Sequence, residues 1–141
     1  MENETIIKDL INQRVEAIRK KNAAAASRHY AASVVLFDVV GPLQHTKPNP
    51  VKKRLEEWLG TFRDEIGYEI AGLQIKAGSR VAFCHSLHHI SADTHNGSKL
   101  DMWWRETLTW EKINNEWLIT HAHSSVPFDV NDGKASVGLK P

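Results

Sequence analysis

Cysteine is almost absent from this chain. Cys84 stands alone among 141 residues, so no disulfide can form within the chain. Such sparing use of cysteine fits a reducing compartment, and we expect a cytoplasmic location. No apolar run approaches the length of a membrane span, so no membrane partner is expected. The opening residues, MENETIIKDL, have neither the basic segment nor the apolar run of a signal peptide.

An excess of charge of either sign is absent too. The 18 basic and 17 acidic residues leave a net charge of +1 and form no long basic patch, so nucleic acid is not expected as a partner. With 41% hydrophobic residues the chain can bury an ordinary core, and its length fits a single domain. We place that domain at residues 1–128 and a tail, which carries turn residues, at 129–141.

Helices are predicted first along the chain. Residues 5–21 place five apolar side chains on one helical stripe, namely Ile7, Leu10, Ile11, Val15 and Ile18. The alanine-rich residues 22–30 favour a second, short helix with Asn22 as its cap. Residues 34–39, VVLFDV, have the β-branched and aromatic composition of a strand. A third helix is predicted to begin with Asn49 as its cap and Pro50 as its first residue.

After Gly67 the apolar period changes to two, which predicts strands. The predicted strands cover residues 68–76, 80–93, 99–112 and 117–128. Helices grouped before a run of strands indicate the α+β class. We expect three N-terminal helices packed on one face of a strongly curved, mainly antiparallel sheet, which leaves a cone-shaped cavity.

Several segments resemble the SnoaL-like, ketosteroid-isomerase-related branch of the nuclear-transport-factor-2-like superfamily. They are HYAASVVLFDVVGPLQHTK, GYEIAGLQI, VAFCHSLHHISAD, WRETLTWEK and WLITHAHSSVPF. The last is the most specific, with a tryptophan followed by two spaced histidines and a serine. The resemblance implies a cone-shaped α+β barrel that usually forms dimers. It does not select an activity, because such relatives include isomerases, polyketide cyclases, dehydratases, transport adaptors and a kinase association domain.

Asp38 is the first candidate for chemistry. It stands between Phe37 and Val39 in an apolar segment, where a partly desolvated carboxylate is a usable base. In the isomerase pattern an aspartate so placed removes a proton beside a carbonyl, and the resemblance assigns that role to Asp38. A structural alternative is an aspartate at a strand end that binds turn amides before Gly41. The sequence departs from the isomerase pattern elsewhere, because it has no tyrosine in the first helix.

His121 and His123 are the second candidates. Alternate residues of a strand share a face, so the two imidazoles are expected about 7 Å apart on one side of the sheet. Arg105 with Trp103 and Asp101, and His85 with His89, share faces of the two preceding strands in the same way. If these faces coincide, the side chains form one polar cluster.

Such a cluster is compatible with three interpretations. It can be a pocket for an anionic or carbonyl substrate, in which Arg105 binds an oxygen, a histidine moves a proton and Trp103 stacks. It can instead be a structural network or dimer face, since domains of the resembled superfamily pack sheet against sheet. The third is a metal site of two histidines and a carboxylate. Arg105 on the same face would repel a cation, so we expect no bound metal.

The opposite face of the same strands has its own candidate, His88, which shares a side with Ser86 and Cys84 and is expected near Trp104 and Ser124. The sequence alone leaves open which face lines the cavity. We expect a homodimer that binds a small organic ligand in each cone and uses no cofactor. It is interpreted as a cofactor-independent acid/base enzyme of isomerase, cyclase or dehydratase type on a small carbonyl compound, or else as a non-catalytic ligand-binding or dimerisation module. The predicted residues are Asp38, His121 and His123 for catalysis and Arg105, Trp103, His88 and His85 for substrate binding.

Overall fold

A computed structural model describes residues 2–46 and 51–141. Its helices and strands, in chain order, are α1 (Glu2–Arg19), α2 (Ala23–Ala26), β1 (Tyr30–Phe37), α3 (Val51–Leu59), β2 (Gly67–Ala77), β3 (Val81–Asp93), β4 (Lys99–Ile113) and β5 (Glu116–Ser125). No helix in these ranges is both long and apolar enough to cross a membrane.

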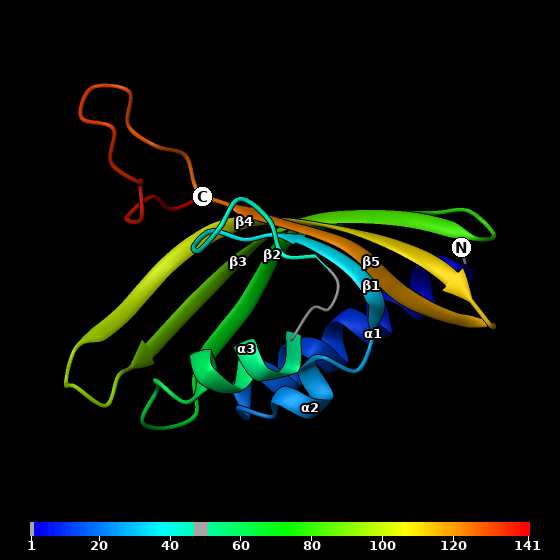
Figure 1. Ribbon diagram of the computed structural model, residues 1–141, viewed down its shortest axis with the longest axis horizontal. Coiled ribbons are helices and arrows are strands. Elements are labelled where there is room, and N and C mark those ends of the chain that lie inside the picture. The colour runs from blue at the N-terminus through cyan, green and yellow to red at the C-terminus, as the bar shows by residue number, and fades with distance from the viewer. Residues whose placement is uncertain (1, 47–50) are drawn as a thin grey trace.

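The five strands form one curved sheet in the order β1-β5-β4-β3-β2. β1 runs parallel to β5, and the other neighbours are antiparallel. Figure 1 shows the three helices together on the concave side of the sheet, which we call the inner face. The C-terminal segment leaves β5 on the other side, which we call the outer face (Figure 1). The predicted α+β architecture is confirmed, and β1 and β2 form the edges of a curved sheet rather than closing a barrel.

The predicted apolar stripe of α1 faces the sheet. Ile7, Ile11, Val15 and Ile18 are buried, and Leu10 is half-buried against the same core. α1 begins at Glu2, three residues before its predicted start, and two glutamates in its first turn favour the helix dipole. It ends at Arg19 rather than at residue 21. The left-handed backbone of Lys21, with φ of 59°, is incompatible with continuing the helix.

α2 is shorter than predicted. Asn22 caps it as expected, because its side-chain oxygen accepts a hydrogen bond from the Ala25 amide at 3.1 Å. The helix ends after Ala26, where the Ser27 hydroxyl donates to the Ala23 carbonyl at 2.8 Å, and Tyr30 already begins β1. The predicted start of α3 at residues 49–50 lies outside the described residues.

The sequence predicted Asp38 inside the strand of residues 34–39, but the structure places it after the end of β1. The strand ends at Phe37, and the Asp38 carboxylate accepts a hydrogen bond from the Val39 amide at 2.7 Å. This local bond starts the turn that passes through Gly41, whose φ of 89° suits glycine. Ladder pairing with β5 therefore stops one residue before the carboxylate.

Register irregularities in β1, β2 and β5 affect which side chains reach the inner face, and those in β2 and β5 are bulges of one extra residue. In β2 the register shifts between Ala71 and Gln74, where Gly72 has the positive φ that such a bulge needs. In β5, Ile119 pairs with Trp110 while His121 pairs with Thr109, so Thr120 is the extra residue. The bulge in β5 changes which residues of the strand face inward. Before it the inward-facing side chains are Trp117 and Ile119, and after it they are Ala122 and Ser124.

Candidate functional site

A cavity of about 510 Å³ lies between the inner face and the helices. Its walls are mainly apolar and aromatic, and include Leu36, Leu55, Trp58, Ile90, Met102 and Trp104. The rings of Trp58 and Trp104 stand nearly perpendicular, with centroids 6.5 Å apart. A cavity of this size with apolar walls and a few polar groups is typical of small-molecule sites.

Five polar residues line one part of this cavity, and we call them the floor cluster: Arg14, Tyr30, Tyr68, Glu106 and Ser124. Arg14 of α1 donates from Nη1 to Oε1 of Glu106 on β4 at 3.3 Å. Their side chains are 12% and 6% exposed, so the ion pair is held away from bulk water. Ser124 of β5 donates to the second carboxylate oxygen of Glu106 at 3.1 Å.

The surroundings of the pair keep both partners charged. Burial raises the pKa of Glu106, but His88, Arg14 and the Ser124 hydrogen bond outweigh it, and the pKa ends below its ordinary 4.5. Burial lowers the pKa of Arg14, while the neighbouring Tyr30 and Glu106 raise it beyond its ordinary value. The floor cluster therefore contains a neutralised pair, not a free charge.

His88 lies behind the floor cluster on β3 and is only 2% exposed. Its Nδ1 forms a short hydrogen bond with the Tyr68 hydroxyl, and its Nε2 lies 3.0 Å from Ser86 Oγ. Burial lowers the pKa of His88, against the smaller opposing effect of Glu106, so the ring is neutral at pH 7. Burial also raises the pKa of Tyr68, which stays protonated.

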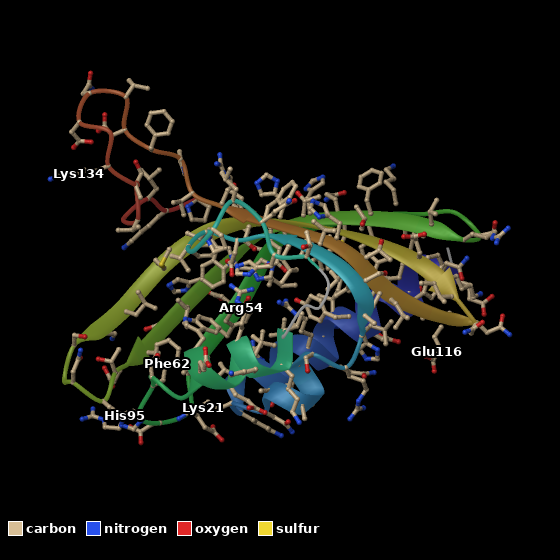
Figure 2. All side chains as sticks on the ribbon, in the orientation of Figure 1. Lys21, Arg54, Phe62, His95, Glu116 and Lys134 are labelled. Atoms are coloured by element: carbon tan, nitrogen blue, oxygen red, sulfur yellow. The ribbon has the colours of Figure 1, made fainter. Side chains whose placement is uncertain are left out.

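At the mouth of the cavity Asp38 meets Arg54. The Arg54 guanidinium lies 2.5 Å from Oδ2 of Asp38, and both residues line the cavity. Figure 2 shows Arg54 reaching from α3 toward the sheet. The Asp38 side chain is 34% exposed, so this carboxylate is a wall residue of the cavity mouth and is less desolvated than predicted.

The other predicted site residues lie on the outer face, except His88. The register places Phe37, His123, Thr107 and His85 side by side in one row across four strands. After the bulge at Thr120, the neighbours Ala122 and Ser124 face the cavity, so His121 and His123 face away from it.

Contacts on the outer face are local. His121 Nδ1 lies 2.7 Å from the Val35 carbonyl, and both imidazoles pack edge-on against Phe37 at 4.6 and 5.4 Å. Arg105 donates to Ser125 at 3.2 Å. The structure therefore does not bring His121, His123, Arg105 or Trp103 to the same cavity as Asp38.

His89, on the same outer face, carries a network that the sequence did not predict. Its two ring nitrogens lie 2.8 Å from Asp101 and 2.9 Å from Glu69, and its ring stacks on Trp103 at 4.6 Å. The hydrogen bond to Asp101, with that to Glu69, raises the pKa of His89. Asp101 and Trp103 are thus engaged with His89 rather than with His121 and His123. Among the residues that the structure describes, no group of three His, Cys, Asp or Glu side chains is arranged to hold a metal ion.

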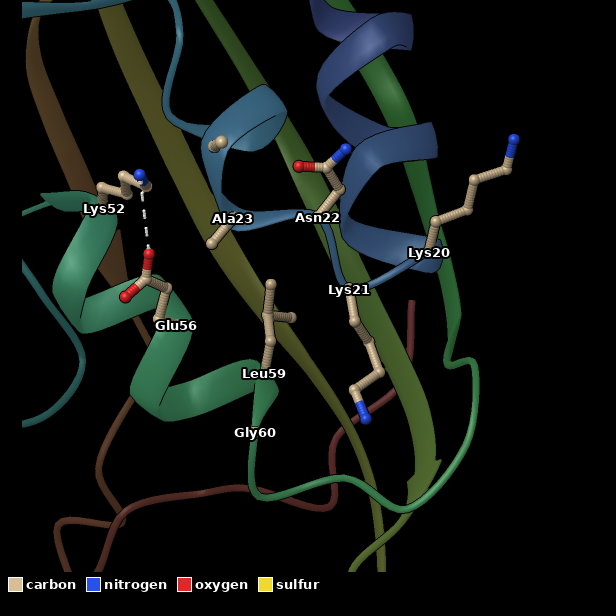
Figure 3. A pocket seen from close by; sticks show the side chains of 9 residues that line it. Lys20, Lys21, Asn22, Ala23, Lys52, Glu56, Leu59 and Gly60 are labelled. Atoms are coloured by element: carbon tan, nitrogen blue, oxygen red, sulfur yellow. Dashed lines mark ion pairs between the residues drawn. The ribbon is translucent and has the colours of Figure 1, made fainter.

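A second concavity lies between α2 and α3, beside the end of α1 (Figure 3). Its cations are engaged within the protein. Lys52 pairs with Glu56 at 3.8 Å, and Lys21 donates to the Phe62 carbonyl at 2.5 Å. This groove is more open to solvent than the cavity, so the cavity is the stronger candidate site.

The residues that sequence reasoning missed are those of the floor cluster other than Ser124, which was expected near His88. Two of them leave a signal. Arg14 continues the helical stripe of Ile7, Ile11 and Ile18 with a charge, and Glu106 interrupts the apolar alternation of β4. A charged residue on each of two buried faces predicts a buried ion pair, because an unpaired charge there would be too costly.

A family model described as the SnoaL-like domain matches residues 7–129. The chain belongs to the SnoaL-like domain family. An NTF2-like protein of unknown function from Pseudomonas putida KT2440 superposes on this SnoaL-like domain with a TM-score of 0.88 at 26% identity, covering 99% of this chain and 97% of that one. None of the curated proteins compared with the domain matches it.

Two further solved structures share the fold of this SnoaL-like domain at lower identity. An NTF2-like superfamily protein from Salmonella enterica serovar Typhimurium is 19% identical, with a TM-score of 0.78 and coverage of 94% and 96% of the two chains. The association domain of CaMKII from C. elegans is 14% identical, with a TM-score of 0.66 and coverage of 89% and 96%. These likenesses support the fold that the resemblance implied.

Proposed function

We propose that this SnoaL-like domain binds a small, uncharged, largely apolar organic molecule in the cavity of the inner face. The observation that carries the proposal is the pairing of charge around an apolar space. Glu106 is neutralised by Arg14 on the floor, and Asp38 by Arg54 at the mouth. A charged ligand would lose its hydration and find no free countercharge in these pairs, whereas an aromatic ligand gains contact with Trp58 and Trp104.

Isothermal titration calorimetry with two probes tests this function. The uncharged 2-naphthol is expected to bind more tightly than the anionic 2-naphthoate. Ala122 is buried and lines the cavity, so Ala122→Phe fills part of it and should abolish binding. Ala32→Phe makes the same change at an exposed position of β1 and should leave the affinity unchanged. Equal binding to both variants would exclude the cavity as the site.

For the same cavity we infer acid/base chemistry on a carbonyl compound, with Asp38 as the base. Its carboxylate lines the cavity mouth, and its two oxygens accept only the Val39 amide and Arg54 among the contacts described, which leaves lone pairs for a proton. The probe reaction is exchange of the hydrogens beside the carbonyl of 2-tetralone in D₂O, followed by NMR. Asp38→Asn should abolish the catalysed exchange and cost at most about 1 kcal/mol of stability, because the ion pair is partly exposed. Unchanged exchange in that variant would remove Asp38 from the chemistry.

A second candidate function is self-association through the outer face. This face exposes Val81 and Phe83, which are 62% and 46% accessible, and it also carries Trp103 and the histidines other than His88 that were predicted for the site. Exposed apolar side chains among polar ones are typical of protein interfaces. We infer a homodimer in which these faces meet, with His121 and His123 serving assembly. Light scattering at micromolar concentration should give the dimer mass for the native chain and the monomer mass for Phe83→Asp. A monomer in both cases contradicts this function.

A further inference from the structure

We propose that the ligand of the cavity carries a hydroxyl group, which donates a hydrogen bond to the oxygen of Tyr68 because the proton of Tyr68 is held by His88. This inference rests on the proposed ligand-binding function and names the class of ligand. It follows from where the hydrogens of Tyr68, His88 and Ser124 are already bound.

The first step concerns the tautomer of His88. A neutral imidazole carries one proton, on either Nδ1 or Nε2. Oε1 of Glu106 lies 3.8 Å from Nε2, and Glu106 is held ionised by Arg14. The negative charge favours the proton on Nε2, where Ser86 Oγ at 3.0 Å accepts it. Nδ1 is then an acceptor.

The second step concerns Tyr68. With Nδ1 as an acceptor, the short hydrogen bond between the two side chains has Tyr68 as its donor. A phenol has a single proton, so Tyr68 has none left for a ligand. Arg14 lowers the pKa of Tyr68 and can only donate, so the Tyr68 oxygen is left as an acceptor.

The third step concerns the rest of the floor. The Ser124 hydroxyl donates its proton to Oε2 of Glu106 at 3.1 Å. Nη1 of Arg14 is engaged by Glu106, and Nε of Arg14 is fully buried, out of reach of a ligand. Tyr68, Ser124 and Glu106 therefore present acceptors to the cavity.

The consequence is a preference for ligands that donate. An ether or ketone oxygen placed against Tyr68 meets lone pairs and loses its hydrogen bond to water, so the carbonyl group of a substrate belongs at the mouth near Asp38 and not against Tyr68. A carboxylate is disfavoured further because it would lose its hydration and find no free countercharge in the pair of Arg14 and Glu106. A phenol or alcohol supplies the missing hydrogen, and an aromatic body fits the walls formed by Trp58 and Trp104.

The test compares 2-naphthol with 2-methoxynaphthalene, which differ in a hydroxyl against a methoxy group. Calorimetry gives the affinity of 2-naphthol divided by that of 2-methoxynaphthalene. We expect this ratio to be about three- to tenfold larger in the native chain than in Tyr68→Phe, which is the range of one net hydrogen bond. Ser79→Ala is the control. It removes an exposed hydroxyl in the turn between β2 and β3, which does not line the cavity, so the ratio should stay as in the native chain.

A third variant tests the role of His88 as a positioning residue. His88→Leu frees the proton of Tyr68, so Tyr68 can donate it to the methoxy oxygen. 2-Methoxynaphthalene should then bind more tightly, and the ratio of the 2-naphthol affinity to the 2-methoxynaphthalene affinity should fall. A purely structural histidine would weaken both probes alike. If the probes bind and Ala122→Phe abolishes binding, but Tyr68→Phe leaves the ratio unchanged, this proposal alone is overturned. If neither probe binds, the proposed function fails and this inference fails with it.

Discussion

The buried pair of Arg14 and Glu106 makes a sharp prediction about stability. Glu106→Gln keeps the size of the side chain and its capacity for hydrogen bonds, but leaves the Arg14 charge without a countercharge. At the observed 3.3 Å, two unit charges attract by about 5 kcal/mol at an effective dielectric constant of about 20. Removing one partner of a buried pair typically costs about 3–5 kcal/mol. We expect a loss in that range.

Urea unfolding followed by tryptophan fluorescence measures this loss. With a denaturant slope of about 2 kcal/mol per molar, the unfolding midpoint should fall by roughly 2 M. Glu111→Gln is the matched control, because Glu111 belongs to the same strand but is exposed on the outer face. It should change stability by less than about 0.5 kcal/mol. Equal losses in the two variants would refute the buried pair.

The difference in unfolding free energy between the native chain and Glu106→Gln should depend on pH with a definite sign. The pKa of Glu106 in the folded protein lies below its ordinary 4.5. Its contribution is therefore fully present above pH 4.5 and is lost as the pH falls through the folded-state value. The difference between the native chain and Glu106→Gln should be constant at neutral pH and shrink in acid. A difference that grows on acidification would contradict this assignment.

Two other predictions concern histidines and a glycine. In an NMR titration His88 should change protonation below pH 6.5, because burial lowers its pKa, and His89 above pH 6.5, because its hydrogen bond to Asp101 raises the pKa. By linkage, His88 destabilises the fold as the pH falls below 6.5. The stabilisation that His89 contributes is full below pH 6.5 and is lost as the pH rises through its pKa in the folded protein. If the titration midpoint of His88 were above that of His89, the burial of His88 and the hydrogen bonds of His89 would both be contradicted. Gly72→Ala should lower the free energy of unfolding by roughly 1 kcal/mol because of the backbone φ of +67° alone, since no atom lies within 4 Å of the added methyl group. The control Gly138→Ala lacks that backbone strain and should change the stability very little. Equal thermal unfolding midpoints of the two variants would argue against the bulge at Gly72.

The order of helices and strands could be predicted because each apolar period is local. The stripe of α1 and the alternation of β3 and β4 are properties of neighbouring residues, so the α+β architecture follows from them. The positions of caps and ends were less predictable. A single hydroxyl, that of Ser27, ends α2, and one left-handed residue, Lys21, follows α1.

The lining of the cavity could not be predicted because it depends on a bulge. Trp117 and Ile119 are buried under the inner face, and a regular strand would carry His121 to that face as well. The extra residue Thr120 sends His121 and His123 to the outer face instead. No pattern in the local sequence marks that insertion, since it arises from the pairing of two strands.

The floor cluster was missed for a related reason. Arg14 and Glu106 are 92 residues apart, and Tyr68 meets His88 only through the pairing of β2 and β3. Spacing along one strand groups residues that share a face, but it does not show which charged groups from different elements neutralise each other. The two charged residues on otherwise apolar faces were the available signal.

The central claim is that the cavity of the inner face is the ligand site. A crystal structure of the protein soaked with 2-naphthol tests it most directly. We predict electron density for the probe between Trp104 and Leu55, with its oxygen within hydrogen-bond distance of Tyr68. Density only in the groove between α2 and α3 or on the outer face, with none in the cavity at saturating probe, would contradict the claim.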